Sequence, residues 1–211
     1  MAENTDLWQI ERDLTEQGIG IICGCDEAGA GPLAGPVYAA AVILPPYCRI
    51  EGLNDSKKLT EKKRETLYEA ITQKAVCWAV AQVEAAEIDA TDILSARMKA
   101  MQQAMDALTI QPEIALIDGN RDKGRSAAIT TPHKLVVGGD GKSASIAAAS
   151  ILAKVSRDRF VAGELDERYP QYQFAKHKGY ATKLHYEMLD KFGPCPEHRR
   201  SFLKKWEEKR I

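Results

Sequence analysis

The sequence predicts an α/β fold in which helices pack on a mixed β-sheet. Three short apolar segments rich in β-branched residues, 19–25, 37–44 and 76–83, are expected to be strands. Only a glycine- and proline-rich loop separates the first two, which indicates a hairpin. A fourth short apolar segment, 114–118, comes after two helical patterns, and this order of elements predicts a sheet with helices packed on it. At 211 residues the chain is long enough for one domain with its own core.

Each main helix is predicted from a cap or from the spacing of apolar residues. Thr60 stands at an N-cap position, and we expect a helix over 60–74, although only half of the capping-box signal is present. One amphipathic helix is expected over 87–108, with methionines as core filler. An alanine-rich helix over 143–165 opens with serine and ends before a Tyr-Pro pair. The apolar residues of the amphipathic helix follow a 4-3-4-3 spacing: Leu94, Met98, Met101, Met105 and Leu108.

The C-terminal part of the chain contains only short helical pieces. Glycine and proline residues interrupt the helical pattern at several positions after residue 178. One further segment, 134–137, is expected to be a fifth strand. We therefore predict a main α/β domain over residues 1–168 and a small helical extension over 169–211.

Composition points to an ordinary globular protein. Hydrophobic residues make up 45% of the chain and charged residues 28%. No apolar run approaches the ~20 residues that a membrane-crossing helix needs. The N-terminus lacks the basic start and apolar core of a signal peptide. The five cysteines form no CxxC pair, which favours reduced thiols. We expect a cytoplasmic protein that does not enter the membrane.

The charge is unevenly distributed along the chain. The net charge is −1, but residues 171–211 carry +5 and the remainder −6. An acidic body with a basic tail is typical of a metal site beside a phosphate-binding surface. A solvated helical face explains the same tail, and charge alone favours that interpretation.

Acidic residues stand at strand ends or in glycine turns at three places. Asp26 and Glu27 follow the first apolar segment, Asp118 ends the fourth, and Asp140 lies between glycines after the fifth. Acids at the ends of neighbouring strands can converge, and Mg²⁺ or Mn²⁺ prefers such oxygen ligands. On an ideal strand Asp26 and Glu27 point to opposite faces. Both can serve one cluster only if the strand ends or distorts there, which the glycines at 29 and 31 would permit.

Other common catalytic patterns are absent from the sequence. The segment 138–143 resembles a phosphate loop, but Val136 stands where the first glycine is needed. Cys23 likewise breaks a dinucleotide fingerprint that would begin at Gly18. No GxSxG occurs. The histidines of the C-terminal part do not have zinc-ligand spacing: His177, His185 and His198.

Five motifs in order give the chain a specific resemblance, which covers residues 20–202. Together they resemble bacterial ribonuclease HII. The resemblance implies a ribonuclease H-like fold, with a mixed five-stranded sheet flanked by helices and a small C-terminal helical extension. The motifs are Asp26-Glu-Ala-Gly-Ala-Gly-Pro-Leu-Ala-Gly-Pro-Val, Leu53-Asn-Asp-Ser-Lys-Lys-Leu, Leu116-Ile-Asp-Gly-Asn, Ser145-Ile-Ala-Ala-Ala-Ser-Ile-Leu-Ala-Lys-Val-Ser-Arg-Asp and His177-Lys-Gly-Tyr.

The same resemblance implies an activity and its chemistry. It implies a monomeric endonuclease that hydrolyses RNA in RNA–DNA hybrids and incises 5′ to ribonucleotides embedded in duplex DNA. Residues 1–168 would be the catalytic domain and 169–211 a substrate-binding extension. Asp26, Glu27 and Asp118 match the family's metal-binding acids and Asp140 its fourth active-site carboxylate. Two Mg²⁺ or Mn²⁺ ions would take part, leaving 5′-phosphate and 3′-hydroxyl ends.

Substrate recognition is also implied by the resemblance. The loop Gly29-Ala30-Gly31 would present backbone groups to a 2′-hydroxyl, the group that marks ribose. Tyr180 would stack on the neighbouring deoxyribose. Basic residues are expected to contact phosphates, Lys57 and Lys58 near the site and the others along the DNA backbone. These others are Lys176, Lys178, Lys183, Arg199 and Arg200.

Two positions depart from the family pattern. Ala30 and Gly138 stand where the family usually has arginine and lysine, and both changes remove a cation that would lie near phosphate. A catalytically weakened hybrid-binding protein therefore remains an alternative. A hydrolase of small phosphate esters that uses the same acids is a third interpretation, in which Tyr180 and the basic tail have no evident role.

Overall fold

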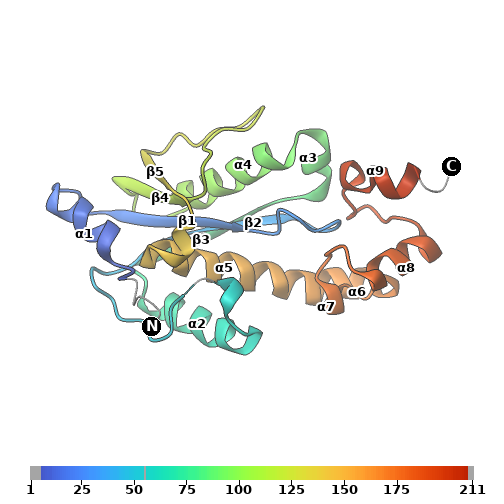
Figure 1. Cartoon of the computed structure of the whole chain (residues 1–211), viewed down its shortest axis with the longest axis horizontal. Helices are drawn as coiled ribbons and strands as arrows, with labels where there is room; N and C mark the ends of the chain where they lie inside the picture. The colour runs from blue at the N-terminus through green and yellow to red at the C-terminus, as the bar shows by residue number, and fades with distance from the viewer. Residues whose placement is uncertain (1–5, 55, 209–211) are drawn as a thin grey trace.

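A computed structural model describes residues 6–54 and 56–208 and shows a five-stranded mixed sheet with helices on both faces (Figure 1). The strand order is β3-β2-β1-β4-β5, with β1–β2 and β2–β3 antiparallel and β1–β4 and β4–β5 parallel. The predicted fold class and the hairpin are therefore confirmed. The strands are β1 Ile22–Ala28, β2 Val37–Ile43, β3 Cys77–Val83, β4 Ile114–Asp118 and β5 His133–Val136.

Helices form a layer on each side of this sheet. Helix α4 packs on one face, and α5 with α2 covers the other. Short helices at the C-terminal end pack around the end of α5 and beside the β1–β2 loop. The longer helices are α1 Gln9–Glu16, α2 Glu61–Lys74, α4 Ile93–Asp106, α5 Ala144–Phe160, α8 Lys183–Phe192 and α9 Arg200–Glu208. The shorter ones are α3 Ala85–Ala90, α6 Asp166–Arg168, α7 Phe174–His177, a π-helical turn Val161–Leu165 and 3₁₀ turns Ser56–Lys58, Gly139–Gly141 and Pro170–Tyr172.

Three sequence-based expectations about these elements were wrong or incomplete. The predicted helix over 87–108 is two helices, because Asp92 is extended and its carboxylate caps α4 by accepting from Ser95 N at 2.9 Å. Strand β1 was expected to end at residue 25 but continues to Ala28, since Asp26 to Ala28 still pair with β2. Helix α1 was not anticipated. Thr60 and Ser143 cap α2 and α5.

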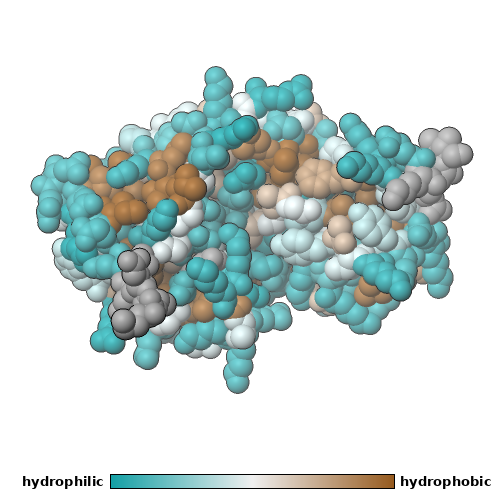
Figure 2. All heavy atoms as spheres, viewed as in Figure 1, coloured by the Kyte–Doolittle hydropathy of each residue, from teal (hydrophilic) through white to brown (hydrophobic). Residues whose placement is uncertain are grey.

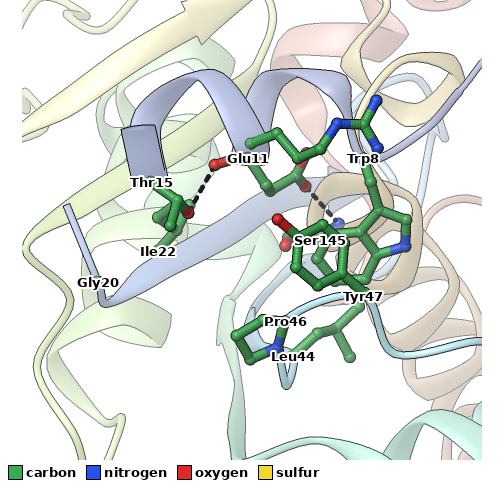
Figure 3. Close-up of a pocket in the computed structure, with 10 residues that line it drawn as sticks. Trp8, Glu11, Thr15, Gly20, Ile22, Leu44, Pro46, Tyr47 and Ser145 are labelled. Atoms are coloured by element: carbon green, nitrogen blue, oxygen red, sulfur yellow. Dashed lines mark hydrogen bonds between the residues drawn. The ribbon is translucent and has the colours of Figure 1, made fainter. Parts of the chain in front are cut away.

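Glycine at position 24 sets the distance between β1 and α5. A Cβ at Gly24 would lie 2.0 Å from the carbonyl carbon of Ser145, so only glycine permits this approach. The start of α5 is also held from α1. Buried Glu11 accepts a hydrogen bond from Ser143 Oγ at 2.6 Å. It also accepts one from Ser145 N at 3.1 Å (Figure 3). The small pocket in that view is lined by Trp8, Tyr47 and this carboxylate. Its visible role is to anchor α5.

The surface differs between the two ends of the molecule. In the orientation of Figure 2, hydrophobic residues gather in patches over the part built around the sheet, whereas the C-terminal helices are mostly hydrophilic on this face. Among residues 6–54 and 56–208, no helix has both the length and the apolar character needed to span a bilayer.

Three buried histidines form a cluster in the C-terminal part, in which two are hydrogen-bonded to each other and the third stacks on one of them. His185 Nδ1 lies 2.9 Å from Tyr180 O and so carries a hydrogen, which leaves its Nε2 to accept from His198 Nε2 at 3.0 Å. His198 Nδ1 then accepts from the Cys195 amide at 3.0 Å. His177 stacks on His185 with ring centroids 4.2 Å apart. Every ring is satisfied as a neutral tautomer, so the cluster is explained as a structural core.

This cluster predicts an acid-sensitive C-terminal part. Burial lowers the pKa of His185 to about 4 and that of His198 to about 3. The unfolded chain takes up these protons near pH 6.5 and the folded chain does not, so stability falls as pH falls from 6.5 towards 4, by up to about 1.4 kcal/mol per pH unit and histidine. We expect His198→Gln, which keeps a donor and an acceptor, to flatten this slope in denaturant unfolding. Parallel curves for the two proteins would contradict the assignment.

Candidate active site

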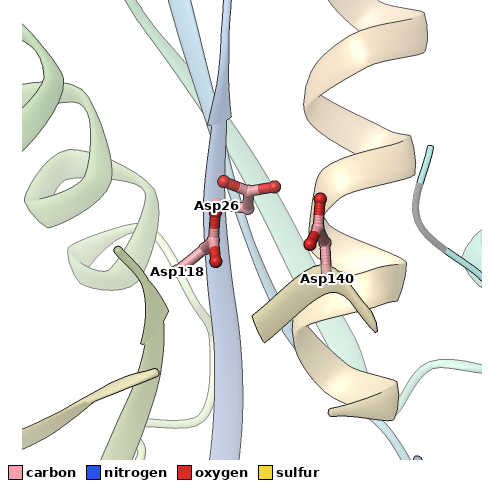
Figure 4. Close-up of side chains that lie close together, drawn as sticks. All are labelled: Asp26, Asp118 and Asp140. Carbon is pink, nitrogen blue, oxygen red and sulfur yellow. The ribbon is translucent and has the colours of Figure 1, made fainter. Parts of the chain in front are cut away.

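Three aspartates converge at one end of the sheet (Figure 4). Asp26 lies on β1, and the parallel pairing of Cys25 with Ile117 brings Asp118, the last residue of β4, beside it. Asp140 lies in the turn that connects β5 to α5. One carboxylate oxygen from each of the three lies within 4.8 Å of the others. The structure thus brings together three of the four predicted acids.

Short hydrogen bonds orient the three carboxylates. Gly139 N donates to Asp118 Oδ1 at 2.6 Å, and Glu27 N donates to Asp26 Oδ1 at 2.7 Å. Lys57 Nζ lies 3.1 Å from Asp140 Oδ2, as an ion pair between an exposed lysine and a buried acid. The side chains are therefore fixed by backbone amides of the neighbouring turn and strand, and by one cation.

The electrostatics of the cluster favour a bound cation. Burial, and then the charges of Glu27 and Asp118, hold the pKa of Asp26 well above its usual range. The pKa of Asp118 is also raised, mainly by burial, although the Gly139 amide opposes this. Carboxylates this close repel one another unless protons or a cation intervene. Oxygen-only ligation by aspartates suits a hard divalent cation.

Glu27 lies apart from this cluster in the structure. Because β1 runs straight through both acids, Asp26 faces α5 and Glu27 faces α4, where its Oε1 lies 2.6 Å from Arg97 Nη2. The strand neither ends nor distorts at these two acids, so the condition under which both would point to one cluster is not met. Burial still raises the pKa of Glu27 despite the arginine. Its Oε2 is buried and has no hydrogen-bond partner within the described part of the chain.

A cleft of about 210 Å³ opens beside two of the aspartates, Asp26 and Asp118. Glu27 and Lys57 also line it, together with the first residues of the glycine loop. Four of the predicted substrate-binding residues line it: Gly29, Ala30, Lys57 and Tyr180. Tyr180 comes from a part of the chain far from the other three. Sequence reasoning missed three polar residues of this lining, although each lies inside a quoted motif: Ser56, Ser150 and Lys154.

Tyr180 lies at the edge of the cleft with 39% of its surface exposed. Lys154 Nζ lies 5.3 Å and the Arg157 guanidinium 5.7 Å from the centre of its ring. The carbonyl of Tyr180 is bound by His185. The ring is thus supported by cations of α5 but open to solvent, as a stacking surface needs to be.

The predicted basic contacts differ widely in accessibility. Lys58, Lys176, Lys183 and Arg200 are exposed, and Lys178 is half-buried. Arg199 is fully buried, and its guanidinium donates only to backbone carbonyls among the residues described. The prediction that Arg199 contacts the DNA backbone is therefore wrong, because its charge does not reach the surface. Its burial could not be read from a charge run.

Gly138 has a structural reason to be glycine. It is exposed, with φ +64° in the left-handed region, and no described atom lies within 4 Å of a Cβ placed there. A lysine would fit sterically but would adopt a conformation that costs about 1 kcal/mol or more. The absence of a cation at this position thus matches the local backbone.

Comparisons with known proteins place the chain in one family. The family model described as Ribonuclease HII matches residues 23–207. A Ribonuclease HII of Idiomarina loihiensis is 57% identical over 182 residues, which is 86% of this chain and 95% of that protein. One from Caldicellulosiruptor bescii is 48% identical over 204 residues, 97% of each chain.

A solved structure shows the same architecture. The ribonuclease H2 of Pyrococcus horikoshii matches with a TM-score of 0.72 at 26% identity, over 90% of this chain and 98% of that one. The family match covers both the acids and the C-terminal helices. The chain therefore belongs to the ribonuclease HII family.

Proposed function

We propose that this protein is a metal-dependent endonuclease that hydrolyses the RNA strand of RNA–DNA hybrids and incises 5′ to ribonucleotides embedded in duplex DNA. The observation that carries the proposal is the cluster of Asp26, Asp118 and Asp140. Two of its members, Asp26 and Asp118, line a cleft that also contains Ala30 and Tyr180. Family membership supports the same reaction class.

The acids fit divalent cations by an observation of the structure itself. Asp26 is buried among like charges, and Glu27 holds a buried oxygen without a described partner. Asp26, Asp118 and Asp140 would hold Mg²⁺ or Mn²⁺. Glu27 lines the same cleft but is paired with Arg97, so it would serve as a further ligand only by leaving that arginine. Bound there, such ions activate a water and stabilise charge on the scissile phosphate and the leaving 3′-oxygen.

The chain's own residues would place the substrate over the acids. Backbone groups of the loop 29–31 would meet the 2′-hydroxyl, and Tyr180 would stack on the next sugar. Lys57 and Lys154 line the cleft and would neutralise phosphates next to the reacting one. Lys58 and the exposed lysines of the extension would add salt-dependent affinity without sequence preference.

A weakened hybrid-binding protein stays the second candidate, favoured by Ala30. This residue lies in the cleft, so a cation there would face the substrate. Hydrolysis of small phosphate esters is disfavoured, because an open cleft edged by Tyr180 and lysines suits a polymer. The domain boundary at 168, a monomeric state and a cytoplasmic location remain predictions.

The acid cluster predicts that a variant without one of its charges is more stable but less active. Asp26→Asn removes a charge that burial and two neighbouring acids disfavour, so the metal-free variant should unfold at higher denaturant than the unsubstituted protein. Incision of a duplex with one ribonucleotide, in Mg²⁺ or Mn²⁺, should fall more than about 100-fold, because the ions supply several kcal/mol. Saturating Mn²⁺ should stabilise the unsubstituted protein by about 2–3 kcal/mol and the variant by less. An active Asp26→Asn or Asp118→Asn protein would refute the proposal.

Gly29 and Gly31 should respond differently to alanine. Gly29 has φ +90° and its Cβ would lie 2.1 Å from Arg157 Nε, so Gly29→Ala should destabilise the fold by more than about 1 kcal/mol. Gly31 is exposed, and no described atom lies within 4 Å of its Cβ. Gly31→Ala should therefore unfold like the parent, within about 0.5 kcal/mol. In the proposed function the loop backbone meets the 2′-hydroxyl, so the added methyl group should still reduce incision. Unchanged incision by Gly31→Ala would remove the loop from recognition.

Ala30→Arg separates the enzyme from the weakened binder. The added cation should raise turnover of the single-ribonucleotide duplex and make log K steeper in log salt by about 0.9 for each new phosphate contact. Ala128→Arg adds the same charge at an exposed position outside the cleft and serves as the control. Tight binding without incision by the parent and by Ala30→Arg would favour the binder.

A further inference from the structure

Two buried arginines hold the loop between β1 and β2 through hydrogen bonds to its carbonyl groups. Arg199 donates to the carbonyl oxygens of Gly29 at 2.7 Å, Ala30 at 3.1 Å and Gly35 at 2.8 and 2.9 Å. Arg157 donates to those of Ala34 at 3.2 Å, Pro36 at 3.1 Å and Lys178 at 3.1 Å. Five carbonyls of the segment 29–36 thus point to two guanidinium groups.

The two guanidinium groups lack a carboxylate. Both arginines are 0% exposed, and neither forms an ion pair with any residue in 6–54 or 56–208. A buried cation without an anion is costly, and hydrogen bonds to carbonyls offset only part of that cost. Burial and the charge of Arg157 lower the pKa of Arg199 to about 9, which still leaves it charged at neutral pH. A destabilising feature next to a candidate active site is typical of residues that are retained for function.

The orientation of the carbonyls determines that of the amides. In a trans peptide the N–H points opposite to the C=O of the preceding residue. Because the carbonyls of Gly29 and Ala30 point to Arg199, the N–H groups of Ala30 and Gly31 point away from it. Neither amide donates to a protein acceptor within the described chain. Ala30 lines the cleft and Gly31 is exposed, so both donors are available to a ligand.

The C-terminal segment, and not the loop alone, imposes this shape. Arg199 N donates to Leu33 O at 2.8 Å, and Gly35 N donates to Glu197 O at 2.9 Å. Leu33 N donates to Gly179 O at 2.8 Å, one residue before Tyr180. A Cβ at Gly179 would lie 2.5 Å from Ala34 O, so the two segments touch through their backbones. The glycine loop and the tyrosine therefore belong to one connected unit.

We propose that Arg199 is a positioning residue that aims the amides of Ala30 and Gly31 into the cleft as a donor pair for the 2′-hydroxyl of a ribonucleotide. This rests on the proposed function and deepens it. Arg199 acts without touching substrate. Lysine carries the same charge but has one nitrogen, so it cannot bind three carbonyls in the planar arrangement that arginine provides.

The test is ribose discrimination by Arg199→Lys. Affinity is measured in EDTA for a duplex with one ribonucleotide and for the same duplex made entirely of DNA. We expect the affinity ratio to fall at least fivefold in Arg199→Lys, through loss of affinity for the ribonucleotide duplex alone. Arg159→Lys, an exposed change on α5 outside the cleft, should keep the ratio of the unsubstituted protein. A ratio within twofold of that protein, or an equal loss for both duplexes, would overturn the proposal.

Two further measurements keep the result interpretable. Hydrogen exchange at the Leu33 and Gly35 amides should be faster in Arg199→Lys while the amides of the β-sheet stay protected, because the loop loosens and the fold remains. In Arg199→Ala, methylguanidinium should restore discrimination and methylammonium at equal concentration should not. Unchanged hydrogen exchange at both amides, or equal rescue by the two cations, would count against a positioning role of Arg199. Absence of incision by the unsubstituted protein would refute the proposed function. Hydrogen exchange would still test whether Arg199 holds the loop in place.

Discussion

The parallel pairing of β1 with β4 is the constraint on which the site depends. It places Asp118 beside Asp26, and repulsion between buried carboxylates must then be met by the surrounding structure. The close approach of α5 at Gly24 and the turn that carries Asp140 complete the cluster from the other side. Strand β1 also carries Glu27 on its opposite face, so a single strand joins the aspartate cluster to the Arg97 ion pair. Holding like charges together lowers the stability of the fold, which is typical of sites that bind cations.

Local sequence signals were sufficient for most elements but not for their exact ends. Apolar strands and serine or threonine caps predicted five strands and the helices α2 and α5, because these signals lie within a few residues of the structure that they specify. The split between α3 and α4 was missed because the apolar series begins only at Leu94, and the Asp92 side chain two residues before it was not recognised as the cap of a new helix. Strand β1 was predicted too short because charged residues at 26 and 27 look like a strand end, whereas pairing with β2 carries the strand on.

The sequence predicted the acids of the candidate site better than the residues that hold the site in place. Asp26, Asp118 and Asp140 could be identified because each sits at a glycine turn next to an apolar segment, and strand ends converge in such sheets. The separation of Glu27 followed from the alternation of side chains along a strand, although glycines nearby suggested a distortion that does not occur. Arg199 could not be placed from sequence. A basic tail looks like a solvated surface, and only the tertiary structure shows which of its charges lies inside.

The contacts between Arg199 and the loop also clarify the effect of having alanine at position 30. The carbonyl of residue 30 is held by Arg199, and the neighbouring carbonyl at 29 is held by the same guanidinium. These contacts involve the backbone alone, so the loop keeps its shape whatever side chain stands at position 30. In the proposed function, a missing cation there would remove a phosphate contact but leave the orientation of the amides intact. Affinity would then depend on charges that face the cleft, and ribose discrimination on a charge buried behind the loop.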